Sequence, residues 1–261
     1  MTRMKISACL ITLNEEQDLP RCLASAAPLV DEIVVIDSGS TDNTRAIAES
    51  FGARVMHQDW LGYVGQKNFA LAQASHPWVL SIDADEEIDE ELAAAIRTLR
   101  AEGAGAEAVA GYIFRRMVQY RGRWIRYGDW YPDPLVRLFL RDKAHFAGGR
   151  VHERMELDGP TRTLPGHLRH FTYRDAEDRN ECISKYAKLW ALTAYEKGKK
   201  AGPVAPLLHS SVRLLRGFIL KRGFLDGAIG WDIALGNARE VWMKYSLLRE
   251  MRRADKAGKR G

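Results

Sequence analysis

The chain has 261 residues, of which 46% are hydrophobic and 28% are charged, and this balance excludes a disordered or fibrous protein. Its three cysteines, Cys9, Cys22 and Cys182, are too irregularly spaced for a disulfide framework or a zinc site, so we expect a reducing, cytoplasmic location. The longest apolar runs, such as residues 6–13, fall well short of the roughly 18 residues that a membrane-spanning helix needs.

The net charge of +5 is unevenly distributed along the chain. Residues 185–261 contain 17 Lys and Arg against 6 Asp and Glu, or +11, and residues 1–184 contain 22 against 28, or −6. A basic segment attached to an acidic body is typical of proteins that bind an anionic membrane surface or a nucleic acid, although a solvated helix face is an alternative. Because no helix-turn-helix, zinc or RNA-binding signature accompanies the charge, we expect no nucleic-acid partner.

Short β-branched runs alternate with longer helical periods over the first hundred residues. The expected strands cover residues 6–13, 32–37, 53–57 and 77–83, and the expected helices cover 16–27, 42–51, 63–74 and 88–101. Such alternation is typical of a parallel sheet covered by helices. The sequence therefore predicts an α/β fold with a Rossmann-like, mostly parallel sheet.

The pattern changes after a small-residue linker near residue 103. Residues 108–170 are richer in aromatic residues, Arg, Gly and Pro, and they predict a mixed or antiparallel extension of the sheet. From residue 176 the chain is again helical. We therefore expect one domain over residues 1–175 and a basic helical C-terminal extension over residues 176–261.

Polar side chains follow three of the expected strands. The first strand ends at Thr12, Asn14 and Glu15, the second at Asp37, and the fourth at Asp83 and Asp85. In an open α/β sheet, ligands bind beyond the carboxyl ends of the strands. These side chains are therefore candidate ligand-binding residues at one edge of the sheet.

Asp83-Ala84-Asp85 is the sharpest of these signals. Two carboxylates separated by one residue at the end of a strand can face one hard cation, which in turn can hold a diphosphate. The pattern is weak by itself, because the first turn of a helix also collects acids that complement the helix dipole. We expect the acids that follow to have only this structural role: Glu86, Glu87, Asp89, Glu90 and Glu91.

Two further segments have both a structural and a functional interpretation. Asp37 begins the run Asp-Ser-Gly-Ser-Thr-Asp, which is typical of a turn, but its carboxylate could also accept a hydrogen bond from a base or a ribose. The segment from Gly65 to Asn68 is either an exposed helical turn or part of a binding site.

Several motifs together resemble a known enzyme family. TLNEE, IDSGSTDNT, GQKNFA and SIDADEE, in that order and spacing, resemble the family 2 glycosyltransferases of GT-A fold. GDWYPDPLVRLFLRD, GRVHER and LRHFTYRD resemble the β-glucosyltransferases of lipopolysaccharide core biosynthesis. The resemblance implies a GT-A catalytic domain that uses a divalent metal and a UDP-sugar. It also implies inverting transfer of a hexose, glucose above all, to a lipid-linked saccharide such as the lipopolysaccharide inner core.

The resemblance also implies roles for individual residues. Thr12, Asn14, Glu15 and Asp37 would line the nucleotide pocket, with Asp37 on the uracil or ribose. Lys67 and Asn68 would lie near the phosphates or the ribose. Asp83 would face the ribose, and Asp85 would bind Mn or Mg.

The general base is not fixed by the motifs, and two carboxylates are candidates. Glu153 follows an expected strand and a Gly-Gly turn, a position that suits a side chain projecting into a cleft, so we favour it. Asp133 is the alternative, although it could instead form a structural salt bridge with Arg137. His170 and His152 are candidates for a further metal ligand, or they are ordinary structural histidines.

The basic C-terminal segment mixes cations with large apolar residues. Helical spacing predicts Leu214, Phe218 and Leu225 on one side, flanked by a set of cations: Arg213, Arg216 and Lys221. That pattern is typical of a helix lying in a bilayer interface, and it predicts a protein peripheral to the inner face of the cytoplasmic membrane. Packing on the catalytic domain or an oligomer contact is the alternative.

Two other functions compete with glycosyl transfer. A nucleotidyltransferase would also use a Rossmann-like sheet and metal-binding carboxylates, but it would need a Gly-rich and basic first loop where this chain has the acidic TLNEEQD. A catalytically inactive, membrane-adherent scaffold of the same fold is the second alternative.

Overall fold

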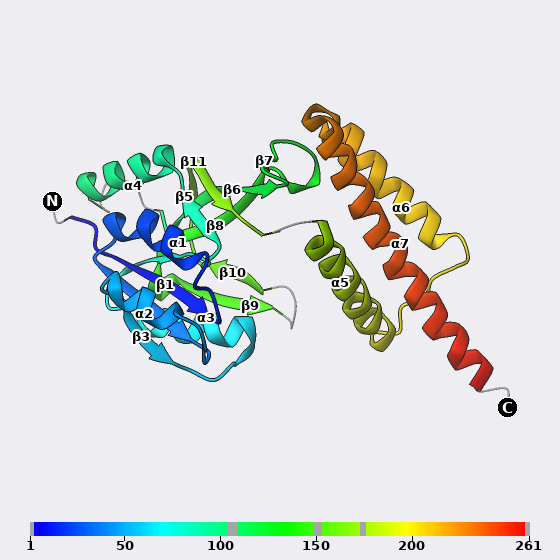
Figure 1. The fold of residues 1–261 in the computed structure, drawn as a ribbon, viewed down its shortest axis with the longest axis horizontal. Helices are drawn as coiled ribbons and strands as arrows, with labels where there is room; N and C mark the ends of the chain where they lie inside the picture. Colours follow the sequence, from blue (N-terminus) through cyan, green and yellow to red (C-terminus); the bar gives the residue numbers. More distant parts are fainter. Residues whose placement is uncertain (1–2, 104–108, 149–152, 173–175, 259–261) are drawn as a thin grey trace. The chain divides into compact units, whose positions relative to one another are not determined.

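The structure is a computed structural model that describes residues 3–103, 109–148, 153–172 and 176–258. The chain forms two compact units (Figure 1). The first unit contains Met1–Met117 and Asp133–Phe171, and the second contains Val118–Pro132 and Thr172–Gly261. The expected α/β fold, with a sheet that continues into antiparallel strands and a helical C-terminal region, is confirmed.

Four parallel strands form one half of the sheet in the first unit. They are β1 (Ile6–Thr12), β2 (Glu32–Asp37), β3 (Arg54–His57) and β4 (Trp78–Ser81), in the order β3-β2-β1-β4. β1, β2 and β4 are almost wholly buried, which is why they are continuous apolar runs and not alternating ones. Their shared direction brings the carboxyl ends of β2, β1 and β4 to one edge.

Four helices connect and cover these strands: α1 (Leu19–Ala26), α2 (Thr44–Ser50), α3 (Gly62–Gln73) and α4 (Glu90–Glu102). A 3₁₀ turn, η1 (Ala27–Leu29), follows α1. Pro20 lies in the first turn of α1, where a missing N–H costs nothing, and the helix buries Leu19, Cys22, Leu23 and Ala26 on one face. All four strands and four helices lie within three residues of their expected bounds.

The other half of the sheet is antiparallel. β5 (Glu86–Ile88), β6 (Gly111–Tyr120), β8 (Asp133–Leu140) and β11 (Thr161–His170) continue the order as β4-β8-β6-β11-β5. A separate ribbon pairs β9 (Ala144–Gly148) with β10 (Glu153–Leu157), and the turn η3 (Arg141–Lys143) precedes it. Because Glu86 and Glu87 lie in β5, their expected place in a helical turn is wrong, whereas Asp89 caps α4 by accepting from the N–H of Leu92.

Apolar side chains pack on both faces of the sheet. Ile6, Ala8 and Leu10 of β1 share one cluster with residues of α1, α2 and α4, and Cys9 belongs to a second cluster with residues of α3 and the β9-β10 ribbon. The alternation follows from the pleat, which points successive side chains to opposite faces. Covered on both faces, the sheet leaves its carboxyl edge as the place for a ligand.

The second unit is mainly helical. It contains β7 (Arg123–Trp124), η2 (Gly128–Trp130), α5 (Ala176–Glu196), α6 (Ala205–Leu215), the π-helical turn η4 (Arg216–Leu220), η5 (Gly223–Asp226) and α7 (Gly227–Gly258). Both α5 and α6 pack on α7 (Figure 1). Within the described ranges, every helix is too short or too polar to cross a bilayer.

Glu32, the first residue of β2, connects this strand to three other segments of the first unit by hydrogen bonds. Its carboxylate accepts hydrogen bonds from Ser7 Oγ at 2.5 Å, from Ser75 N at 2.8 Å and Ser75 Oγ at 2.8 Å, and from Arg54 Nη2 at 3.0 Å. Burial by itself raises the pKa of Glu32, but these hydrogen bonds outweigh it and lower the pKa to about 2.

We therefore predict that Glu32→Gln lowers the free energy of unfolding at pH 7 by about 1–3 kcal/mol, the range for losing hydrogen bonds to a charged group. Because the folded pKa lies below the unfolded value of 4.5, the stabilisation is complete above pH 4.5 and is lost as the pH falls toward 2. Urea unfolding across this range should show the two proteins converging in acid. Glu49→Gln, at an exposed position of α2, is the matched control and should show no such convergence.

Candidate active site

Three of the predicted site residues follow neighbouring strands at the carboxyl edge of the sheet. Thr12 ends β1 directly opposite Asp37, which ends β2, and Asp83 follows β4 on the other side of β1. Neighbouring strands lie about 4.8 Å apart, so β2 and β4 are separated by roughly 10 Å. The side chains that the sequence singled out therefore meet at one edge.

Asp37 closes the turn that follows β2. Its Oδ1 accepts hydrogen bonds from the backbone N–H groups of Gly39 at 3.0 Å and Ser40 at 2.9 Å, and its Oδ2 accepts from Thr12 Oγ1 at 3.0 Å and from the Ser40 hydroxyl. Burial raises the pKa of Asp37, but the hydrogen bonds from Ser40, Gly39 and Thr12 lower it overall. The structure shows the turn, with both carboxylate oxygens engaged, and contact of Asp37 with a base or a ribose stays a prediction.

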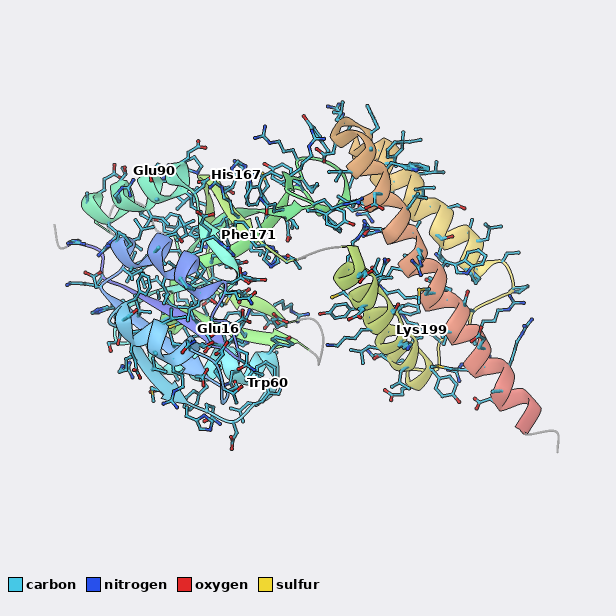
Figure 2. All side chains as sticks on the ribbon, in the orientation of Figure 1. Glu16, Trp60, Glu90, His167, Phe171 and Lys199 are labelled. Carbon is cyan, nitrogen blue, oxygen red and sulfur yellow. The ribbon has the colours of Figure 1, made fainter. Side chains whose placement is uncertain are left out.

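The loops after β1 and β2 are joined by hydrogen bonds. The N–H of Asn14 donates to Ser40 Oγ at 2.8 Å, and the N–H of Glu15 donates to Thr44 Oγ1 at 2.7 Å. The Glu16 carboxylate, labelled in Figure 2, accepts two N–H bonds from the second loop at 3.0 and 2.9 Å. Asn14 adopts a left-handed backbone with φ of 57°, which asparagine tolerates better than most residues. The two loops are thus held together beside the carboxyl ends of β1 and β2.

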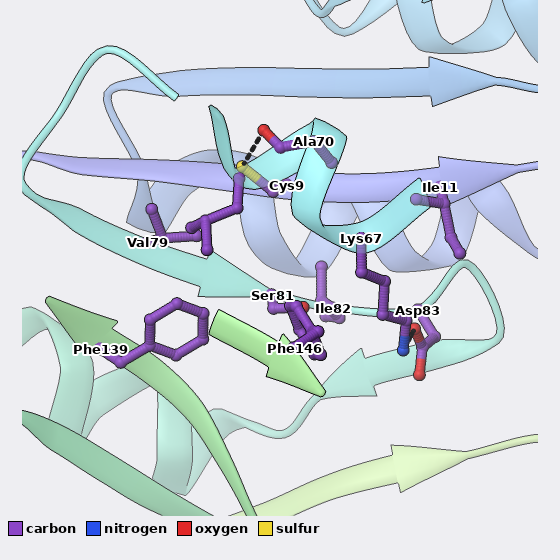
Figure 3. Close-up of a pocket in the computed structure, with 11 residues that line it drawn as sticks. Cys9, Ile11, Lys67, Ala70, Val79, Ser81, Ile82, Asp83, Phe139 and Phe146 are labelled. Atoms are coloured by element: carbon purple, nitrogen blue, oxygen red, sulfur yellow. Dashed lines mark hydrogen bonds and ion pairs between the residues drawn. The ribbon is translucent and has the colours of Figure 1, made fainter. Parts of the chain in front are cut away.

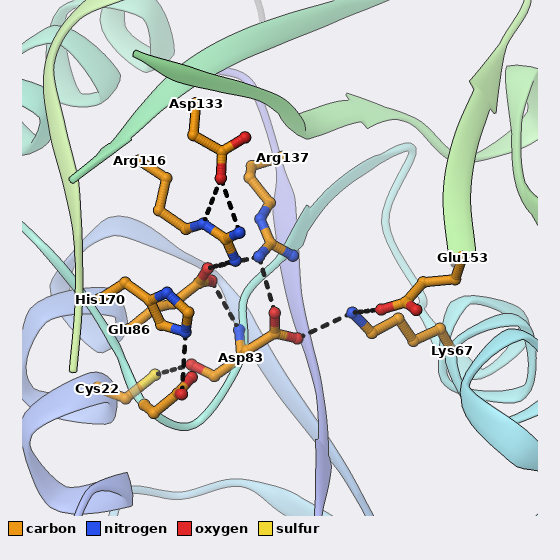
Figure 4. Close-up of polar contacts among 10 residues, drawn as sticks. Cys22, Lys67, Asp83, Glu86, Arg116, Asp133, Arg137, Glu153 and His170 are labelled. Carbon is orange, nitrogen blue, oxygen red and sulfur yellow. Dashed lines mark hydrogen bonds and ion pairs between the residues drawn. The ribbon is translucent and has the colours of Figure 1, made fainter. Parts of the chain in front are cut away.

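Asp83 lies between two cations (Figure 4). Its Oδ2 is 2.7 Å from Arg137 Nη2, and its Oδ1 is 3.0 Å from Lys67 Nζ. Burial opposes ionisation, but Arg137 and Lys67 together hold the pKa of Asp83 well below its usual value. The carboxylate is therefore ionised throughout the physiological pH range.

Arg137 also binds a second carboxylate, that of Glu86, which is buried. Arg137 Nη2 is 2.5 Å from Glu86 Oε1, and Glu86 Oε2 accepts the backbone N–H of Asp83 at 3.0 Å (Figure 4). The Glu86 side chain is fully buried, and this burial raises its pKa in spite of Arg137. Glu86 therefore fixes the loop that carries Asp83 and Asp85, a role that the sequence analysis missed.

A signal for this network was present in the sequence. Arg137 is the one charge within the apolar run LVRLFL of β8, and a cation in a buried strand requires a buried partner. The expected structural salt bridge of Asp133 does form, but its expected partner, Arg137, is wrong. Asp133 binds Arg116, whose Nε and Nη2 lie 3.0 and 2.7 Å from Asp133 Oδ2.

Lys67 connects Asp83 to Glu153. Its Nζ lies 3.0 Å from Asp83 Oδ1 and 3.4 Å from Glu153 Oε1, and its side chain is only 9% exposed. The alternative of an exposed helical turn for this segment is therefore wrong, since Gln66 is buried as well. Lys67 also lines a small pocket, together with Cys9, Ile11, Ser81 and two phenylalanines (Figure 3).

Asn68 holds the neighbouring ribbon in place. Its Nδ2 donates to the carbonyl of Phe146 at 2.8 Å, and its Oδ1 accepts the N–H of Phe146 at 2.8 Å. The amide thus pairs with β9 as another strand would. Contact of Asn68 with a nucleotide stays a prediction.

Asp85 and His170 form a further pair of polar side chains. Asp85 Oδ2 is 3.0 Å from His170 Nε2, at the point where β11 ends beside β5. The two side chains offer one oxygen and one imidazole nitrogen, and nowhere in the described residues do three His, Cys, Asp or Glu side chains gather as a metal site. His152, the other candidate, lies outside the described residues.

Residues 7–151, more than half of the chain, match the family described as Glycosyl transferase family 2. The chain belongs to this family. This family 2 glycosyltransferase is 31% identical over 264 residues to the lipopolysaccharide core biosynthesis glycosyltransferase LpsC of Rhizobium meliloti, and the match covers 94% of each chain. It is also 50% identical over 261 residues to an uncharacterized glycosyltransferase of Rickettsia felis, covering 94% of this chain and 90% of that one. The nucleotidyltransferase alternative is thereby set aside.

Two solved structures are similar to this chain. Glucosyl-3-phosphoglycerate synthase of Mycobacterium tuberculosis, in complex with Mn²⁺, UDP and phosphoglyceric acid, is 22% identical with a TM-score of 0.48, over 76% of this chain and 80% of that one. TarS of S. aureus in complex with UDP is 16% identical with a TM-score of 0.47, over 96% and 92% of the two chains.

The buried network yields a prediction about stability. Arg137→Gln should destabilise the protein by about 3–5 kcal/mol, because it leaves the buried carboxylate of Glu86 and the partly buried carboxylate of Asp83 without their shared cation. Adding Glu86→Gln to that variant should recover at least about 1 kcal/mol, because one uncompensated charge is then removed. Urea unfolding of both single variants and the double variant measures this coupling.

Arg115→Gln is the matched control for the network. Arg115 is exposed on β6, so its loss should change the free energy of unfolding by no more than about 0.5 kcal/mol. Strictly additive effects of the Arg137 and Glu86 substitutions would contradict the proposed coupling.

Proposed function

We propose that this glycosyltransferase moves a hexose, glucose in particular, from a UDP-sugar to a lipid-linked saccharide such as the lipopolysaccharide inner core, with inversion at the anomeric carbon. One observation carries the proposal: Lys67 joins Asp83, which follows β4, to Glu153, at the start of β10. A donor-binding carboxylate and a candidate base are thus held in one ion-paired group beside Asp85.

The donor would bind over the edge formed by β1, β2 and β4. The nucleotide would lie against the loop that carries Asn14 and Glu15, which is hydrogen-bonded to the loop after β2. The hydrogen bond between Thr12 and Asp37 stabilises the conformation of these loops. Asp83 is ionised and can accept hydrogen bonds from ribose hydroxyls. Lys67 is placed to offset the negative charge of the diphosphate, while Asn68 positions β9.

Asp85 and His170 would hold the divalent cation. Carboxylate oxygen suits both Mg²⁺ and Mn²⁺, and imidazole suits Mn²⁺. Two protein ligands fit a cation that also takes water and substrate phosphate oxygens, as Mg²⁺ usually does. When bound, the cation supplies the positive charge that stabilises UDP as the leaving group.

Glu153 is our choice for the general base. It would take the proton of the acceptor hydroxyl as that oxygen attacks the anomeric carbon, and Lys67 Nζ, 3.4 Å from Glu153 Oε1, holds it in place. Asp133 is the weaker candidate, because two nitrogens of Arg116 already bind one of its oxygens.

The acceptor class is supported by the relatives. The Rhizobium meliloti protein that is 31% identical over nearly the whole chain is named for lipopolysaccharide core biosynthesis. A lipid-linked saccharide made on the inner face of the cytoplasmic membrane would fit that name, and we propose that the enzyme acts there.

The metal assignment can be tested by calorimetry with UDP and Mn²⁺. Asp85→Ala should weaken Mn²⁺-dependent UDP binding by about 100-fold, since losing even a group that merely supports a metal ligand costs roughly 10- to 100-fold. Asp142→Ala removes an exposed carboxylate from η3 and should bind UDP as the wild type does. Unchanged affinity in Asp85→Ala would remove Asp85 from the metal site.

The activity itself can be followed as UDP released from UDP-glucose in the presence of Mn²⁺, with water as a slow acceptor. Glu153→Gln should bind UDP normally but release it about 100-fold more slowly, the scale of general base catalysis. Asp133→Asn is the comparison variant and should retain most of the rate. The reverse ranking would make Asp133 the base, and a wild-type protein that binds the donor but releases no UDP would support the inactive scaffold.

A further inference from the structure

The helix α6 in the second unit exposes large apolar side chains and buries small ones, which is the reverse of an ordinary surface helix. Its large aliphatic side chains Leu208, Val212 and Leu215 recur at spacings of four and three residues and are all exposed. The positions it buries are the small residues Pro206 and Ser210. A helix that faced only water would bury its aliphatic side chains. We therefore expect this exposed face to bind an apolar partner.

The exposed apolar face continues beyond α6. In η4, Ile219 and Leu220 are exposed, Leu220 by 77%, and in η5 Phe224 and Leu225 are exposed as well. The ring of Phe224 lies 6.2 Å from that of Phe218 in an edge-to-face contact. We call the exposed apolar side chains of α6, η4 and η5 the docking surface.

This arrangement differs from the stripe expected from the sequence. Leu214 and Phe218 are half-buried, and Phe218 packs against Trp231 with ring centroids 4.9 Å apart. The exposed stripe is rotated by one residue, from Leu214 to Leu215. The rotation arises because Gly217 packs against Asp129: a Cβ there would lie 2.8 Å from Asp129 Oδ2.

Cations are held beside the docking surface by a buried carboxylate. Asp129, whose side chain is 1% exposed, lies 3.0 Å from Arg213 Nε, 3.3 Å from Lys221 Nζ and 3.9 Å from Arg216 Nε. One negative charge faces three positive ones, so the group retains a net charge of +2. Residues 197–225 as a whole contain seven Lys and Arg and no Asp or Glu.

We propose that the docking surface binds the interface of an anionic phospholipid bilayer. Its aliphatic side chains would enter the boundary between headgroups and acyl chains, and Arg213, Arg216 and Lys221 would contact lipid phosphates. The charge distinguishes this partner from a second copy of the chain, since pairing two such faces would bring like charges together. Trp231, exposed on α7 beside Phe218, is a residue type enriched at bilayer interfaces.

The proposal goes beyond glycosyl transfer and stands on the second unit alone. Only its purpose, confining the enzyme to the plane of a lipid-linked acceptor, rests on the proposed function. Vesicle binding needs no donor or metal, and UDP release needs no lipid. Failure of one would therefore leave the other in place.

Co-sedimentation of the full chain with lipid vesicles tests the docking surface. The wild-type protein should bind equimolar phosphatidylglycerol–phosphatidylcholine vesicles, and binding should weaken by about 10-fold or more with phosphatidylcholine alone or in about 0.5 M NaCl. Leu215→Glu should reduce binding by about 10-fold or more, because it removes apolar area and adds a repelled charge. Leu192→Glu, at an exposed position of α5, is the matched control and should bind within about twofold of the wild type.

Three results would overturn the proposal. They are a wild-type protein that does not bind anionic vesicles, a Leu215→Glu variant that binds as well as the wild type, and a lipid-free dimer that Leu215→Glu converts to monomers. Circular dichroism checks that each variant is folded. If Leu215→Glu unfolds, Leu220→Ser replaces it, since Leu220 is the most exposed aliphatic side chain of the surface and its loss should still weaken binding severalfold.

Discussion

The guanidinium of Arg137 is a full positive charge inside the first unit, and the arrangement of the site depends on what neutralises it. Two carboxylates do so: Glu86, which is buried, and Asp83, which is the first acid of the Asp-Ala-Asp motif. Since a buried cation is costly unless it is paired, the loop after β4 has few other conformations open to it. The same pairing that stabilises the fold also orients Asp83 and leaves Asp85 to face His170.

The parallel half of the sheet could be predicted from the sequence because its signals are local. Hydrophobic runs and helical periods of a few residues give the strands and helices, and the carboxyl ends of parallel strands must share an edge. The placement of Thr12, Asp37 and Asp83 at that edge followed directly. No contact between distant residues had to be known.

The buried polar network could not be predicted in the same way. Glu86 looks like one more acid at a helix start until Arg137, which is 51 residues away, is seen beside it. The pairing of Asn68 with the backbone of Phe146 spans 78 residues and has no signature in either segment. Local patterns report which residues are polar, whereas the partner of each polar residue is set by the antiparallel half of the sheet. For that half, the sequence predicted a mixed or antiparallel extension of the sheet but not which strands pair.

Beyond the catalytic chemistry, the course of the backbone limits how the protein can be divided. The chain passes between the two units at residues 117–118, 132–133 and 171–172. Tyr120 and Ile125, from the middle of the chain, pack with Ile233 of α7 in a small core of the second unit. A truncated enzyme ending near residue 175 would therefore expose this aromatic and aliphatic core to water. The terminal helices and residues 118–132 form one structural unit, so the helices cannot be removed or exchanged by themselves.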